Sequence, residues 1–154
     1  MAVHRAFGKR RGVQSRSIQP SDGVALVGLA LSCAYDLTTV GAWAREAGMC
    51  ETQLRLRCRI AGVPAKVSLD FVRVLRAGLC REVRGGALTD YLDVGDPRTM
   101  RRLLARVGRS GPDNPTVLEY VSAQRVIRDV ALIEELKKVL TPMATFRHHD
   151  GPHH

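Results

Sequence analysis

Arginine is the residue type with which this sequence is best equipped to do chemistry, and its arginines cluster in two short segments. Arg55 and Arg59 stand in the first segment, and Arg98, Arg101 and Arg102 stand in the second. A guanidinium donates paired hydrogen bonds to phosphate oxygens and to the edge of guanine, so both segments could contact a nucleic acid. The chain carries 24 Lys and Arg against 15 Asp and Glu, a net charge of +9. This excess favours a polyanionic partner, nucleic acid first and an anionic membrane surface second.

Motifs for other chemistry are absent or weak. His4 is the only histidine before the C-terminal tail, and no nucleophile elbow or phosphate-binding loop occurs. The cysteines Cys33, Cys50, Cys58 and Cys80 form no CxxC or CxH pair. We expect them to be small buried residues of a reduced protein, with a redox-sensing pair as the alternative. The sequence predicts a protein that is not an enzyme and needs no cofactor or metal, although the tail histidines could bind a metal.

The overall composition is that of a globular domain outside the membrane. A hydrophobic share of 45% and a charged share of 25% exclude wholesale disorder. No run of 18 apolar residues occurs. The charged residues near the N-terminus are not followed by the apolar segment that a secretion signal requires. We therefore expect a cytoplasmic protein that does not enter a membrane and that associates with the nucleoid if its partner is DNA.

The elements that must position the arginines are predicted to be helices, and the predicted fold class is all-α. Aromatic residues make up only 5% of the chain, and apolar residues recur at steps of three and four. The segment behind Ser21 is apolar almost all round, so that helix has to be buried. The other predicted helices cover 38–47, 51–61, 65–83, 98–107 and 116–140, the last of them one helix or a helix pair ended by Pro142.

Turn and capping residues separate these helices at the places that matter for the arginines. Gly48 suits the left-handed conformation of a sharp turn, and Leu54 behind it suits the core, which is the spacing of a helix-turn-helix. Asp96 and Pro97 form an N-cap and a first helical position for the helix that carries the second arginine segment. The helix over 65–83 has one apolar side, which includes Val83, and one charged side. The charged side consists of Lys66, Asp70, Arg73, Arg76 and Arg81.

Four regions follow from these boundaries. Residues 1–20 form a basic mobile arm, either a solvated tail or an additional contact to phosphates. Residues 21–110 form the domain that holds both arginine segments. Residues 116–141 form the C-terminal helix or helix pair, in which Glu134 and Lys138 are expected to pair. Residues 144–154 form a disordered His-rich tail.

The order of these elements resembles the AraC-type DNA-binding domain of bacterial transcription regulators, over about residues 21–108. The stretches LTTVGAWAREAGMCETQLRLRCRIAG and GDPRTMRRLLARVG carry the resemblance. Leu69, Arg73 and Ala77 fall on the family's linker-helix pattern. The resemblance implies two helix-turn-helix units joined by a long linker helix. Cys50 replaces the family's capping serine, and the second unit is about three residues short.

The resemblance also implies which residues read DNA. The family's base-reading positions fall on Thr52, Arg55 and Leu56 in the first unit. At 100° per residue, Thr52, Leu56 and Arg59 point away from the core, and Gln53 and Arg55 lie on the flanks. The positions that match in the second unit are Arg98, Arg101 and Arg102. Arg55 is expected to bind guanine, Thr52 a thymine methyl or a phosphate, and Leu56 only apolar groups.

The predicted function is therefore a sequence-specific regulator of transcription that reads double-stranded DNA with two recognition helices, with RNA polymerase as a further partner. The alternative is a helical protein-interaction adaptor that keeps the fold without base reading. For each arginine the competing interpretation is a solvated helix face. The C-terminal helix either packs on its own chain or forms a homodimer, which would place two basic domains on neighbouring half-sites.

Overall fold

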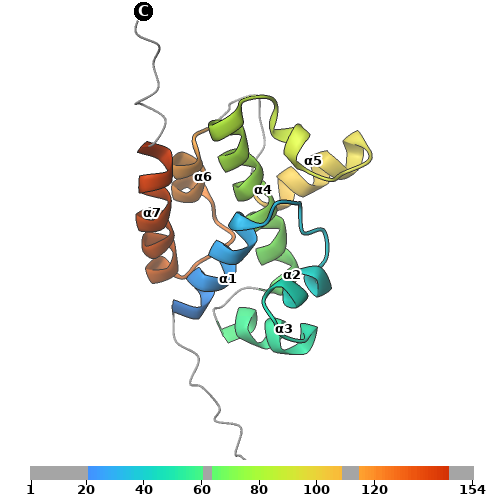
Figure 1. Ribbon diagram of the computed structural model, residues 1–154, viewed down its shortest axis with the longest axis vertical. Helices are drawn as coiled ribbons and strands as arrows, with labels where there is room; N and C mark the ends of the chain where they lie inside the picture. The colour runs from blue at the N-terminus through green and yellow to red at the C-terminus, as the bar shows by residue number, and fades with distance from the viewer. Residues whose placement is uncertain (1–20, 61–63, 109–114, 146–154) are drawn as a thin grey trace, which may run out of the picture.

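The computed structural model describes residues 21–60, 64–108 and 115–145, with the side chains of 21, 22, 59, 60 and 143–145 excepted. These residues form seven α-helices and one 3₁₀ turn and contain no strand, which confirms the all-α prediction (Figure 1). The predicted arm and residues 146–154 lie outside the described part of the chain. The elements are α1 (Ser21–Ser32), α2 (Val40–Glu46), α3 (Glu51–Ile60), α4 (Ala65–Arg84), η1 (Leu88–Tyr91), α5 (Pro97–Arg106), α6 (Val117–Ala123) and α7 (Val130–Thr145).

Helix α4 is the centre of the fold. It is buried on all sides from Ser68 to Leu79, and α1, α2, α3, η1, α5 and α6 all pack against it. Three residues of its charged side, Asp70, Arg73 and Arg76, are buried as well. Val83, predicted for the core, lies near the end of α4 and is 65% exposed. Packing on every side therefore overrides the amphipathic pattern, and the buried charges require partners.

Helix α1 is buried as its composition requires, and the C-terminal helices provide much of its cover. The chain returns from α6 to α7 along the side of α1 and α4 that faces away from α2 and α5 (Figure 1). Gly23 of α1 faces Leu132 of α7 so closely that a Cβ at Gly23 would lie 3.3 Å from the leucine Cδ1. The rings of Phe71 on α4 and Tyr120 on α6 stack at 5.4 Å. The C-terminal segment is thus a helix pair that packs on its own chain, and its buried residues belong to the same core as those of α1–α5.

Several details of this helix pair differ from expectation. Pro142 does not end the last helix, since α7 continues to Thr145. A proline inside a helix removes the hydrogen bond to the carbonyl four residues before it and crowds that carbonyl. Here the carbonyl is that of Lys138, which is an exposed residue. Val130, which the apolar spacing of 116–140 predicts for the core, is 73% exposed, whereas Leu132 is buried. Glu134 pairs with Lys137 at 3.1 Å and not with Lys138.

The segment between α4 and α5 holds no α-helix. A single 3₁₀ turn, η1, stands where the first helix of a helix-turn-helix is expected, and only α5 is a full helix. Leu88 and Leu92 anchor this region in the core. In the part of the chain that is described, no helix is both long and apolar enough to cross a membrane.

Candidate nucleic-acid interface

Helices α2 and α3 meet at a turn built by local chemistry. Thr39 caps α2, its Oγ1 accepting a hydrogen bond of 3.0 Å from the N–H of Ala42. Gly48 has φ +66°, the left-handed conformation that glycine adopts without strain. Ala44 is 1% exposed and Leu54 is fully buried, so both sit in the core as the pattern predicted. The turn therefore fixes α3 against α2 and leaves the opposite face of α3 in solvent.

The outer face of α3 presents Thr52 and Leu56, both exposed and one helical turn apart. Leu56 is 50% exposed, an unusual placement for a large apolar side chain. Gln53 is exposed, and its Oε1 accepts a hydrogen bond of 3.1 Å from the N–H of Cys50, which closes the start of α3. The side chain of Arg59 lies outside the described residues.

Arg55 is not a free cation on this face. Its Nε and Nη2 donate to Oε1 of Glu51, four residues earlier, at 2.9 and 2.5 Å. Both side chains are about half exposed. Among the side chains that are described, the outer face of α3 is therefore mixed, with Glu51, Arg55, a hydroxyl and a leucine.

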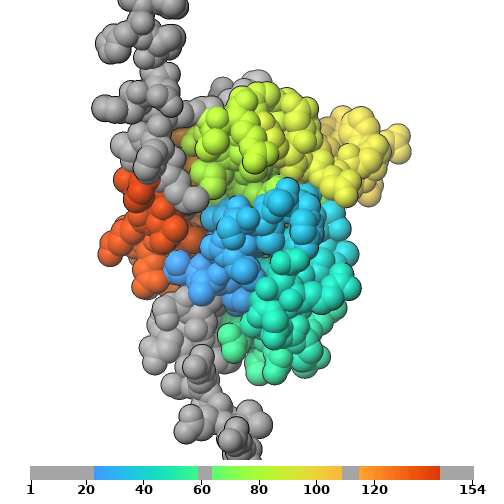
Figure 2. All heavy atoms as spheres, viewed as in Figure 1, coloured from blue at the N-terminus to red at the C-terminus, as the bar shows by residue number. Residues whose placement is uncertain are grey.

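Helix α5 presents a face of a different character. Asp96 caps it, accepting from the backbone N–H groups of Arg98 and Thr99 at 2.9 Å and from the Thr99 hydroxyl at 2.6 Å. Pro97 occupies the first helical position. One side of the helix packs inward through Met100, Leu103 and, just beyond its end, Val107. Figure 2 shows the segment around α5 standing out from the body of the molecule.

The charged residues on the exposed side of α5 are all arginines. Arg98, Arg101 and Arg102 are exposed, and among the described residues no carboxylate lies within ion-pair distance of any of them. Arg106, at the end of the same helix, donates from Nε to the buried Oδ2 of Asp70 at 2.9 Å. Asp70 also accepts from Lys66 at 3.1 Å. The Asp70 carboxylate therefore ties α5 to α4 without neutralising the three outer arginines.

A buried ion pair holds the loops around α5 in place. Asp36 accepts from Nε and Nη2 of Arg73, at 2.6 Å for the shortest bond, and from the N–H of Asp93 at 2.8 Å. Arg76 donates to the carbonyls of Cys33 and Tyr91 at 2.9 and 3.4 Å. Two arginines of α4 thus clamp the loop before α2 and the loop before α5. The sequence pattern did not identify this role.

Helices α3 and α5, which carry the two candidate faces, both lie away from α6 and α7 (Figure 1). In Figure 1, α2 and α3 occupy the lower right and α5 the upper right, whereas α6 and α7 lie at the left. A cavity of about 540 Å³ lies between η1 and the start of α5, lined by Val94, Pro97, Met100 and Arg101 among others. It is open to solvent and forms part of the α5 surface.

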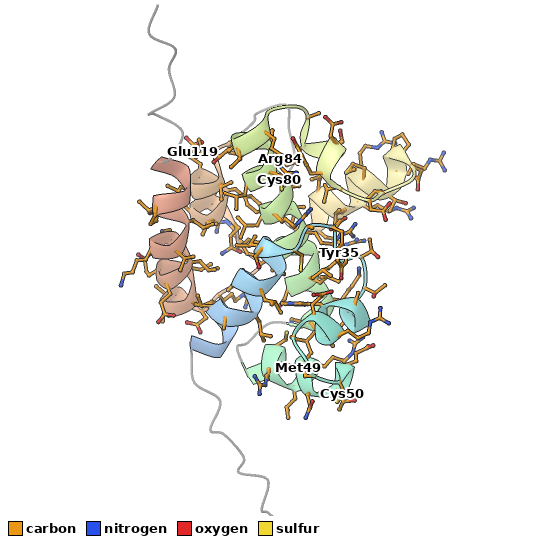
Figure 3. The ribbon with its side chains drawn as sticks, viewed as in Figure 1. Tyr35, Met49, Cys50, Cys80, Arg84 and Glu119 are labelled. Atoms are coloured by element: carbon orange, nitrogen blue, oxygen red, sulfur yellow. The ribbon has the colours of Figure 1, made fainter. Side chains whose placement is uncertain are left out.

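The cysteines and the tyrosine of the loop before α2 add no reaction centre. All four thiols are free, and Cys50 is exposed beside Met49 at the α2–α3 turn, contrary to the expected burial (Figure 3). Burial raises the pKa of the Cys58 thiol, which keeps it protonated. Tyr35 donates to Glu46, and this bond raises the pKa of the tyrosine. No group of three or more metal-ligating side chains occurs within the described ranges.

Comparison of the chain with protein-family models, with curated proteins and with solved structures finds no match. The geometry of the α3 and α5 faces is therefore the basis for a functional proposal.

Proposed function

We propose that the protein binds double-stranded DNA in a sequence-dependent way and regulates transcription, with α5 and α3 as its contact elements. The observation that carries this proposal is the face of α5, on which three exposed arginines have no acidic partner among the described residues. Unpaired guanidinium groups on one helix face attract phosphates strongly and are otherwise unfavourable neighbours of one another. The net charge of +9 acts in the same direction.

The two helices contribute differently to this binding. On α5 the charge of Arg98, Arg101 and Arg102 supplies affinity through phosphate contacts, which carry no sequence information directly. On α3 the exposed Thr52 and Leu56 offer a hydroxyl and methyl groups, which suit a thymine methyl in the major groove. A dimer through α7 has little support, because the apolar side of α7 is buried in its own chain.

Fluorescence anisotropy with a random-sequence duplex at 50 and 200 mM salt tests this proposal. The variant R101Q/R102Q removes two charges from α5, and R125Q/R128Q removes two exposed charges between α6 and α7 as a matched control. We expect the first variant to flatten the slope of log K against log salt by about 1.8, which is about 0.9 for each phosphate that is no longer neutralised. The control should change the slope much less. Equal losses of affinity in both variants, or no binding of the wild type at low salt, would contradict the proposal.

The second candidate is a protein-interaction adaptor, which the half-exposed Leu56 and the missing helix before α5 favour. An adaptor would bind DNA weakly and without sequence preference. Selection from a randomised duplex library separates the two functions, because only a sequence-specific DNA binder enriches a consensus site. If Leu56 contacts a base, Leu56→Ala should alter that consensus at one position.

A further inference from the structure

Glu51 holds Arg55 by two hydrogen bonds to a single oxygen. Nε and Nη2 of the guanidinium donate to Oε1 at 2.9 and 2.5 Å, and the two side chains are 48% and 50% exposed. An arginine has five N–H donors, so this contact uses two and leaves three. Two of the remaining three point from the end edge formed by Nη1 and Nη2. Two such parallel donors can bind O6 and N7 of guanine together.

A glycine in the facing helix makes room for the carboxylate. Gly41 of α2 has no side chain, and a Cβ at that position would lie 3.2 Å from Oε2 of Glu51. Oε1 of the same carboxylate faces Arg55. The carboxylate is therefore placed from two sides, by the guanidinium and by the bare backbone of α2. An isolated surface pair on a single helix has only the first of these constraints.

The carboxylate affects bases and phosphates in opposite ways. A phosphate that approaches Arg55 also approaches the negative Glu51, so part of the attraction is cancelled. The edge of a base carries only partial charges, so the repulsion that it meets is much weaker. Because Glu51 already restricts the rotamers of Arg55, the side chain loses less conformational entropy when it binds a base.

We infer that Glu51 is a positioning residue that reserves Arg55 for the edge of guanine and keeps it from the phosphate backbone. The inference rests on the proposed DNA binding and adds to it the source of base selectivity. It predicts that removal of Glu51 increases the affinity for arbitrary DNA and reduces the preference for the consensus site over arbitrary DNA. A residue that merely stabilised α3 would do neither.

The test compares wild type, E51Q, R55Q and E51Q/R55Q on a random duplex and on the selected consensus duplex at 50 and 200 mM salt. For E51Q we expect the salt slope on random DNA to steepen by about 0.9, because one more phosphate is neutralised. This corresponds to about a 3.5-fold larger fall in affinity for the fourfold rise in salt. The preference for the consensus over random DNA should fall in E51Q and in R55Q.

Two controls isolate the role of the Glu51–Arg55 pair. E134Q removes an exposed, ion-paired glutamate from α7 on the other side of the molecule, and it should leave both slope and preference unchanged. G41A changes no charge, and its Cβ shifts Oε2 of Glu51 by only a few tenths of an ångström, so it should lower the preference less than E51Q does. Circular dichroism verifies that each variant is folded, which Gln in a helix and Ala in place of Gly both favour.

The double variant decides between a held arginine and simple repulsion. If Glu51 acts through Arg55, the E51Q effect disappears in the R55Q background. An E51Q effect of equal size in both backgrounds would overturn the inference, and so would unchanged slope and preference in E51Q. A wild type that binds no DNA at all would instead overturn the proposed function, which is a distinct outcome of the same titration.

Discussion

At the scale of single residues, the charges inside the protein matter more to the fold than those on its surface. Asp36 and Arg73 are 5% and 8% exposed, and the carboxylate accepts both from the guanidinium and from the Asp93 N–H. Arg73 also donates to the carbonyl of Asp93 at 3.3 Å. A buried pair with its hydrogen bonds satisfied is tolerated, but one buried charge without the other is not.

Asp36→Ala should therefore lower the free energy of unfolding by about 3–5 kcal/mol, because it leaves the Arg73 guanidinium buried without its counter-ion. Urea unfolding followed by circular dichroism measures this change. Glu134→Gln breaks the exposed pair with Lys137 and should cost at most about 0.5 kcal/mol. A decrease below about 1 kcal/mol for Asp36→Ala would show that water reaches Arg73 and that the pair does not clamp the loops.

The roles of these residues could not be read from the sequence. The periodicity of 65–83 assigned Asp70, Arg73 and Arg76 to one side of a helix, and that was right. It could not show that Asp36 or Arg106, about 36 positions away in either direction, would cover that side. The same limit applies to Arg55, since an exposed position was predictable but its contact with Glu51 depends on the rotamers of both side chains.

At the scale of elements, boundaries set by local chemistry were predictable. The Thr39 cap, the left-handed Gly48, and Asp96 followed by Pro97 all lie where their residue types indicated. These features depend on neighbours within four residues. The predictions for Pro142 and Val130 were wrong because α7 is positioned by packing on α1 and α6. A local sequence pattern does not contain that information.

The cap of α5 makes this element sensitive to acid. The Thr99 hydroxyl, followed by the N–H groups of Thr99 and Arg98, holds the pKa of Asp96 below its ordinary value. Because the folded pKa is lowered, the contribution of this carboxylate to stability is complete above the ordinary pKa of an aspartate. It disappears as pH falls through the lowered value.

Asp96→Asn should remove this part of the pH dependence, since asparagine caps a helix well but does not titrate. Thermal unfolding between about pH 5 and pH 2 measures it, and the difference in midpoint between wild type and variant should shrink or reverse as the pH falls. Identical acid dependence in both proteins would mean that other carboxylates dominate and that the cap does not titrate in this range.

At the scale of the whole molecule, α6 and α7 form a cover for α1 and α4 and leave the side of α3 and α5 free (Figure 1). Leu136 of α7 is fully buried, whereas Val139 on the same helix is 43% exposed. The cover is therefore part of the core. The sequence predicted the apolar content of this segment but left open whether it packs in its own chain or against another.

Leu136→Ala should cost about 2–5 kcal/mol of stability through the cavity that it leaves, and Val139→Ala should cost less than about 1 kcal/mol. Urea unfolding at several protein concentrations measures both values. The midpoints should not depend on concentration, because the leucine is buried within one chain. A midpoint that rises with concentration would show that α7 also stabilises a dimer.

The packing of α1 against α7 also sets the order of events while the chain is made. Helix α1 leaves the ribosome first among the described elements, yet the leucine that covers Gly23 is in the last of them. The apolar side chains of α1 therefore remain partly uncovered until synthesis has passed α7. We expect the core to close only after α7 has emerged, and the nascent chain to be a substrate for chaperones that bind short apolar segments.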